Sequence, residues 1–186
     1  MNEKIKILLE ECRKIQEEII NLKKPQRKDW NKINSYENQQ FERINKISKL
    51  LQGELSEKKS FKEFEPEEFA GEDQYASVIG EIFSKKYHGN KCKVEMKTSQ
   101  LRKFFDSARK IEADLFTKGE DWNGAKVDFY LLKPKLAYAK GRDLIPEQFY
   151  NIIMTCLSNI DSKEDFKRFM QFFEAIVAYH KFHGGD

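Results

Sequence analysis

The stretch SKEDFKRFMQFFEAIVAYHKF, residues 162–182, decides the fold class. One face of a helix through it carries Phe166, Phe169, Met170, Phe173, Ile176, Val177 and His180, and a second face carries Phe172, Ala175, Tyr179 and Phe182. These spacings of three and four residues are typical of an α-helix. Because it is apolar on two faces, we expect this helix to be central, or to contact a partner as well. Ser162 is predicted to cap its start, and Gly184 and Gly185 to end it.

The segments before this helix repeat the same helical spacing. One is predicted to begin after Thr98 as its N-cap, with an apolar face formed by Leu101, Phe104, Phe105, Ala108, Ile111 and Leu115. Another covers residues 125–140, in which Pro134 either kinks one helix or starts a second. A third opens at Pro146, and an earlier one covers residues 74–87, ending at His88-Gly89-Asn90. With only 9 Gly and 4 Pro to form turns, we predict an all-α bundle of four to five helices rather than a β fold.

The first 56 residues predict a helical hairpin. The positions Ile5, Leu8, Cys12, Ile15, Ile19 and Leu22 form the seam of a coiled coil. Pro25 is expected to end this helix, and a second one over residues 30–55 should pack antiparallel to it. We therefore divide the chain into the hairpin (1–56), a linker with one helix (57–96) and a helical core (97–186). In the linker, Phe61, Phe64 and Phe69 suggest loose docking onto the core, and the alternation of Cys92, Val94 and Met96 suggests an extended segment.

Composition excludes several classes of protein. The chain has 186 residues, of which 35% are charged, while 15 Phe and 7 Tyr argue against disorder. No apolar run approaches the roughly 20 residues of a membrane span, and residues 1–6 lead into a charged helix rather than a signal-peptide core. The 3 cysteines are odd in number and far apart, so we expect no disulfide framework and a reduced, cytoplasmic protein.

The usual signatures of catalysis are missing from the sequence. His180 and His183 have a spacing that can bind a metal, but no third ligand is placed near them. No glycine-rich phosphate loop is present. Cys156 lies in an apolar stripe and is predicted to be buried and inert. We expect no enzymatic activity, no metal and no cofactor. A helical metalloenzyme built on the two histidines remains an alternative hypothesis.

The cations are concentrated in one segment. Residues 97–142 hold eleven Lys/Arg against six Asp/Glu, whereas residues 143–186 hold four against seven. The basic set is Lys97, Arg102, Lys103, Arg109, Lys110, Lys126, Lys133, Lys135, Lys140 and Arg142. Arg102 and Arg109 are seven residues apart on the predicted helix, as are Lys103 and Lys110. From charge alone, both a solvated helix surface and a cradle for nucleic-acid phosphates are open.

Three sequence blocks resemble a known family. They are TSQLRKFFD (98–106), LLKPKLAYAKGR (131–142) and FFEAIVAYHKFHGG (172–185). Their order and content resemble the small subunit of type III-A CRISPR effector complexes, the Csm small subunit, over about residues 97–185. The resemblance implies an all-helical, non-catalytic, RNA-binding protein of antiviral defence. It also implies as partners the guide and target RNA, the backbone and large signalling subunits, and further copies of the chain itself, with no membrane.

The resemblance and the basic set together give the candidate RNA contacts, with Lys97 and Lys140 taken from the basic set. Those expected to bind phosphates are Lys97, Arg102, Lys103, Arg109, Lys110, Lys133, Lys135, Lys140 and Arg142. Leu136, Ala137 and Tyr138 are expected to pack in the core. The hairpin exceeds what the family leads us to expect, and its regular Ile/Leu seam predicts a protein contact rather than an RNA contact. The alternative function is a purely structural protein–protein adaptor with little direct RNA contact.

Overall fold

The computed structural model describes residues 1–24, 28–87, 89, 93–119 and 121–185, and every regular element within these ranges is helical. The elements are α1 (Glu3–Leu22), α2 (Trp30–Glu57), η1 (Phe61–Glu63), α3 (Pro66–Phe69), α4 (Tyr75–Ile82), η2 (Lys85–Tyr87), α5 (Thr98–Phe116), α6 (Trp122–Tyr130), α7 (Leu132–Gly141), α8 (Glu147–Ser158) and α9 (Lys163–Phe182). The predicted all-α class is confirmed. Pro25, His88, Asn90 and Cys92, on which some expectations rested, lie outside the described residues. Among the described helices, none is both long and apolar enough to cross a bilayer.

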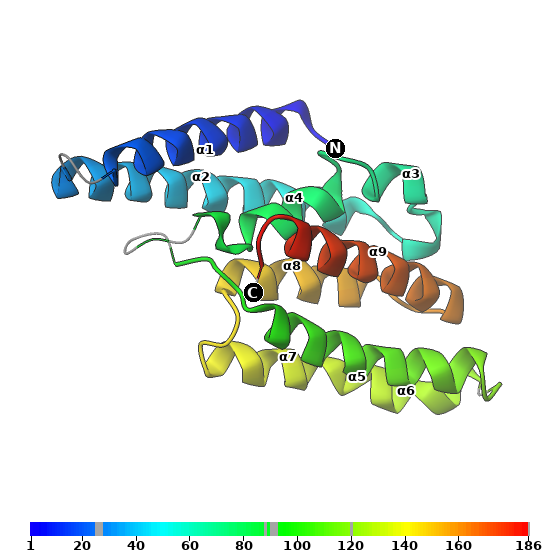
Figure 1. Cartoon of the computed structure of the whole chain (residues 1–186). Helices are drawn as coiled ribbons and strands as arrows, with labels where there is room; N and C mark the ends of the chain where they lie inside the picture. Colours follow the sequence, from blue (N-terminus) through cyan, green and yellow to red (C-terminus); the bar gives the residue numbers. More distant parts are fainter. Residues whose placement is uncertain (25–27, 88, 90–92, 120, 186) are drawn as a thin grey trace.

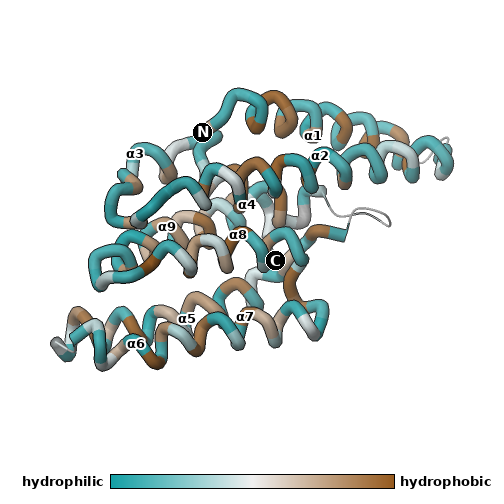
Figure 2. Tube along the Cα trace, turned by 180° about the vertical axis from the view of Figure 1, so that it is seen from behind, coloured by the Kyte–Doolittle hydropathy of each residue, from teal (hydrophilic) through white to brown (hydrophobic). Residues whose placement is uncertain are grey.

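The helices form three layers (Figure 1). The hairpin α1–α2 is one outer layer, α5, α6 and α7 are the other, and α4, α8 and α9 lie between them. Helix α9 packs against α4, α5, η1 and α3, so its predicted central place is confirmed. Its rings Phe166, Phe169 and Phe173 are fully buried. Figure 2 shows apolar segments in all three layers, alternating with hydrophilic segments along the same helices.

Helices α4 and α9 approach closely at Gly80. A Cβ at this position would lie 2.6 Å from the backbone nitrogen of His180, so only glycine fits without a shift. The buried His180 ring bonds through Nε2 to the Phe83 carbonyl oxygen (3.1 Å) and through Nδ1 to Thr98 Oγ1 (3.3 Å). The prediction that Thr98 is an N-cap is therefore wrong. The cap is Lys97, which makes no side-chain capping bond, and Thr98 is the first residue of α5 and bonds to α9.

Other helix ends agree better with the sequence. Ser162 Oγ accepts from the Asp165 amide, as predicted. Pro134 is the third residue of α7, after a break at Leu131, so it belongs to the first turn of a separate helix, where a proline disrupts least. Pro146 is the N-cap of α8 rather than its first residue.

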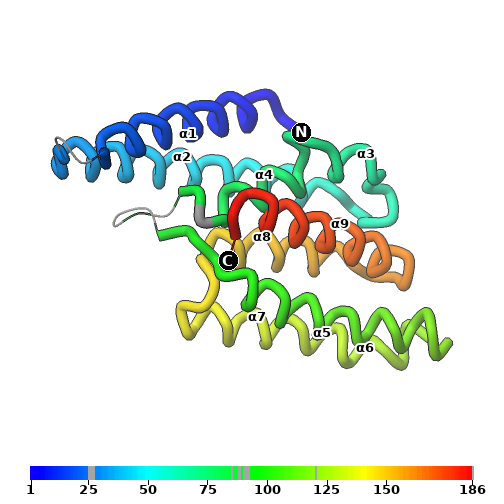
Figure 3. The backbone as a smooth tube through the Cα atoms, viewed as in Figure 1, coloured from blue at the N-terminus to red at the C-terminus, as the bar shows by residue number. Residues whose placement is uncertain are grey.

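The hairpin is antiparallel, as Figure 3 traces. Its base joins the main core through Ile5, Leu9 and Cys12. Its far end holds a separate small cluster of Ile15, Ile19 and Ile33. The predicted seam is thus largely buried, although Leu9 is buried more deeply than Leu8.

The segment between hairpin and core is tightly packed, and the expected loose docking is wrong. Phe61 and Phe64 are fully buried and Phe69 nearly so, and all three rings contact Phe172 of α9. Every residue of α4 is buried. Val94 and Met96 are buried without forming a strand, in a segment where the Met96 amide donates to the Phe83 carbonyl (2.9 Å).

Candidate nucleic-acid interface

Helix α5 displays its cations along two lines, because residues seven apart share one side of a helix. Arg102 and Arg109 form one line. Arg109 is already paired, with its Nη1 2.9 Å from Glu112 Oε2 and its Nη2 3.8 Å from Glu174 Oε1 of α9. Lys103 and Lys110 form the second line. Both are exposed, and within the described ranges neither has an ion-pair partner.

Lys103 of the second line borders a groove between α5 and α7, whereas Lys110 is not among the residues that line it. This groove has a volume of about 250 Å³. Lys103 lines it from α5, while Lys135 of α7 and Arg142, directly after α7, line it from the other side. No carboxylate of the described residues pairs with any of these three cations. The groove therefore brings together three predicted site residues whose charges are not neutralised within the described part of the chain.

An exposed tyrosine stands in the lining of the groove. Tyr138 is 64% exposed. Arg142 Nη1 donates to its hydroxyl at 3.1 Å, and the Arg142 guanidinium lies 5.6 Å from the ring centroid. The expectation that Tyr138 and Ala137 pack in the core is wrong, since both are exposed, while Leu136 is buried as predicted. The reason is that α7 is an outer helix, which buries only its inner side.

The other predicted cations lie elsewhere. Lys140 Nζ is 3.6 Å from Glu147 Oε1. It shares with Lys97 a wider hollow of about 820 Å³, whose lining also includes acidic residues, so that surface is mixed in charge. Lys133 lies over the Tyr130 ring at 5.6 Å, and Lys126 does so at 6.0 Å. Arg102 is exposed, with no ion pair to a described residue.

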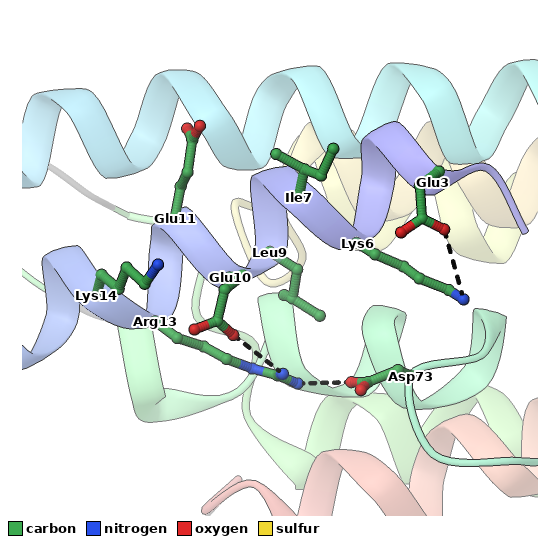
Figure 4. Close-up of a pocket in the computed structure, with 9 residues that line it drawn as sticks. All are labelled: Glu3, Lys6, Ile7, Leu9, Glu10, Glu11, Arg13, Lys14 and Asp73. Atoms are coloured by element: carbon green, nitrogen blue, oxygen red, sulfur yellow. Dashed lines mark hydrogen bonds and ion pairs between the residues drawn. The ribbon is translucent and has the colours of Figure 1, made fainter.

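A second hollow, of about 510 Å³, lies beside α1 and the start of α4 (Figure 4). Arg13 crosses it, with Nη2 2.7 Å from Asp73 Oδ1 and Nη1 3.8 Å from Glu10 Oε2. Arg13 also donates to the fully buried Glu81 of α4, from Nε at 3.0 Å and from Nη2 at 2.6 Å. This hollow is therefore occupied by ion pairs that join the hairpin to the core.

Glu81 collects two further donors. Lys86 Nζ lies 2.6 Å from Glu81 Oε1, and the Tyr87 hydroxyl donates to the same oxygen at 2.5 Å. Burial alone would raise the pKa of Glu81, but the hydrogen bonds from Arg13, Lys86 and Tyr87 outweigh it and lower the pKa to about 2. A carboxylate within the apolar helix α4 indicates a function or a distant partner, but the sequence does not identify that partner as Arg13, 68 residues away.

The candidate catalytic groups are not brought together. Among the described residues, no three His, Cys, Asp or Glu side chains form a group that could hold a metal. The His180 ring is buried and hydrogen-bonded through both of its nitrogens. Burial lowers the pKa of both His180 and His183. Cys156 is buried as predicted, and burial raises the pKa of its thiol, which disfavours the reactive thiolate.

Comparison with known proteins gives the family. No curated protein and no solved structure matches the chain. A family model described as Csm2 Type III-A matches residues 73–186. The match begins just before α4, so it includes the whole middle layer and the groove between α5 and α7, and reaches further forward than the three sequence blocks. Since it covers more than half of the 186 residues, the chain belongs to the Csm2 family, the small subunits of type III-A CRISPR complexes.

Proposed function

We propose that this chain is a non-catalytic RNA-binding subunit of a cytoplasmic type III-A CRISPR ribonucleoprotein acting in antiviral defence. In this proposal several copies lie along the filament of backbone subunits, and each holds the guide–target RNA through phosphate contacts from its α5–α7 layer. Such contacts are electrostatic and independent of RNA sequence. They position a strand and require no reacting group.

One observation carries the proposal. Lys103, Lys135 and Arg142 converge on a single groove, and none is paired with a carboxylate of the described residues. A surface cation that is already paired would have to exchange its carboxylate for a phosphate, which reduces the net gain in binding free energy. Unpaired cations meet a phosphate without that exchange, so this groove is the favoured phosphate site and Arg109 and Lys140 are weaker candidates.

A structural adaptor is the second candidate, and a different observation favours it. The outer side of α6 exposes Val127 (68%), Tyr130 (48%) and the following Leu131 (48%). Exposed apolar residues grouped on one surface are typical of protein contacts. This surface is compatible with RNA binding at the groove, because Val127, Tyr130 and Leu131 are not among the groove's lining residues.

The test removes three charges from the groove. We expect Lys103→Ala, Lys135→Ala and Arg142→Ala together to lower the magnitude of the log–log salt slope of RNA binding by about 2, at about 0.7 per phosphate. At 0.1 M salt this corresponds to about 100-fold weaker binding. Fluorescence anisotropy of a labelled single-stranded RNA with the full chain measures both quantities.

The matched control removes three exposed cations from the hairpin and the segment after it, at Lys4, Lys46 and Lys59. It lowers the net charge equally and should leave the slope unchanged. Equal losses in both variants would mean that only net charge matters, and the groove assignment would be wrong. Failure of the assembled complex to crosslink RNA to any position in residues 97–142 would favour the adaptor.

A further inference from the structure

The groove between α5 and α7 has a floor unlike a simple phosphate site. It is apolar, formed by Leu101 and Phe104 of α5, Leu136 and Ala139 of α7, and Phe149 of α8. A phosphate gains nothing from such walls, because an anion is poorly solvated there. The apolar floor therefore favours an apolar group, whereas the cations at the rim favour an anion.

The rim combines charge with an aromatic ring. Lys103, Lys135 and Arg142 supply the charges, and Tyr138 presents an exposed ring, which Arg142 approaches by donating to its hydroxyl and placing its guanidinium 5.6 Å from the ring centroid. Aromatic rings beside backbone-binding cations are the arrangement by which proteins hold single-stranded nucleic acid. The ring is thus placed to stack on a flat group that enters the groove.

We propose that this groove binds one unpaired nucleobase of an RNA strand, which stacks on Tyr138 above the apolar floor while its flanking phosphates lie on Lys103, Lys135 and Arg142. This rests on the proposed function and adds the chemical class of the ligand. A nucleotide is the group that combines a flat, largely apolar face with an anion on either side. An apolar protein side chain would fill the floor but would leave three cations at its edge without counter-charges.

The first test compares two probes of equal charge and length. One is a twelve-residue oligouridine, and the other is the same backbone with abasic riboses. A stacked base contributes about 1–3 kcal/mol, so we expect the full chain to bind the oligouridine about 5- to 150-fold more tightly. Equal affinity for both probes would overturn the nucleobase proposal while leaving phosphate binding intact. Binding of neither probe would instead overturn the proposed function.

The second test fills the groove. Ala139→Leu adds bulk to the floor and should remove the difference between the two probes without changing the affinity for the abasic one. Ala137→Leu is the matched control, because Ala137 is exposed on the same helix and does not line the groove. If the difference persists in Ala139→Leu, or disappears equally in Ala137→Leu, the groove is not the base site.

A further variant, Tyr138→Ala, tests the same proposal if Ala139→Leu folds poorly. Tyr138→Ala removes an exposed ring, so it should melt at the temperature of the unmodified chain and lose the same base-dependent affinity. Tyr130→Ala removes an exposed ring outside the groove lining and should retain it. An unchanged preference for oligouridine in Tyr138→Ala would refute the stacking role. If the two groove variants bind RNA normally but fail to assemble with the other subunits, the occupant is a protein side chain.

Discussion

Replacing Arg13 by Met should destabilise the whole fold, although Arg13 lies in the hairpin, outside the residues that the family model matches. The change retains most of the side chain's length and removes its charge and donors. Glu81, whose side chain is fully buried, would lose both bonds from Arg13 and keep those from Lys86 and Tyr87. A buried carboxylate that loses one of its charged partners is left partly uncompensated, which is the costly case.

Two estimates bound the effect. Removing one partner of a buried ion pair costs about 3–5 kcal/mol, and the two remaining donors of Glu81 place this case at or below the low end. Independently, the pKa of Glu81 falls from 4.5 to about 2 in the folded chain, which is worth about 3 kcal/mol as the net of unfavourable burial and all of its favourable donors. We therefore expect Arg13→Met to lower the free energy of unfolding by about 2–3 kcal/mol. For a chain of this length this corresponds to a decrease in Tm of about 5–10 °C.

The matched control is Arg43→Met in the same hairpin. Arg43 Nε lies 2.6 Å from Glu11 Oε2, but the Glu11 side chain is 45% exposed, whereas that of Glu81 is fully buried, so this pair should contribute about 1 kcal/mol or less. Urea denaturation of both variants at pH 7 gives the comparison. A loss in Arg13→Met no larger than in Arg43→Met would refute the buried network as a source of stability.

The pH dependence offers an independent check on the same network. Because the folded pKa of Glu81 is the lower one, its contribution is complete above about pH 5 and is lost as the pH falls toward 2. The loss of stability across this range should be smaller in Arg13→Met than in the unmodified chain.

Two further predictions concern α9. Gly80→Ala should lower stability by about 1–3 kcal/mol in a thermal melt, because the new Cβ would meet the α9 backbone at His180. Gly53→Ala, with open space around it, is the control and should be neutral or stabilising. Equal effects of the two substitutions would contradict the close approach of α4 and α9. Burial lowers the pKa of His180, so the unfolded chain takes up its proton first and stability should fall as the pH drops below about 6.5. His180→Gln should reduce that fall in denaturation experiments at pH 7 and pH 5, and an undiminished fall would assign the dependence to other groups.

The spacing of apolar residues predicted the helices well. A helix that buries one side has an apolar residue every three to four positions, whichever element covers that side. The same pattern identified α9 as central, since it packs against α4, η1 and α5, although Phe182 at the end of its second apolar face is 73% exposed. Burial preference failed at Tyr138. The Leu136-Ala137-Tyr138 triplet reads as a core pattern, yet α7 is an outer helix and exposes two of the three residues.

The long-range polar contacts were beyond any reading of local pattern. Thr98 is a plausible cap by residue type, but its hydroxyl lies beside His180, 82 residues away. Glu81 lies within an apolar helix, where a carboxylate signals either a function or a distant partner, and its partner Arg13 is in another layer. The candidate site was predictable as a set of cations, whereas their division into paired and unpaired ones required the fold.

The hairpin has two parts with different consequences for assembly. The base of the hairpin covers the core. Ile5, Leu9 and Cys12 belong to the same core cluster as α4, and Arg13 donates to the buried carboxylate of Glu81. Removing the hairpin would therefore expose the apolar side of the middle layer and leave a buried carboxylate short of donors. Its far end has its own small apolar cluster and extends past the middle layer in Figure 1, with Ile20 and Trp30 about half exposed. The base of the hairpin therefore stabilises the core, whereas the protein contact predicted for the hairpin could involve the far end without disturbing that core.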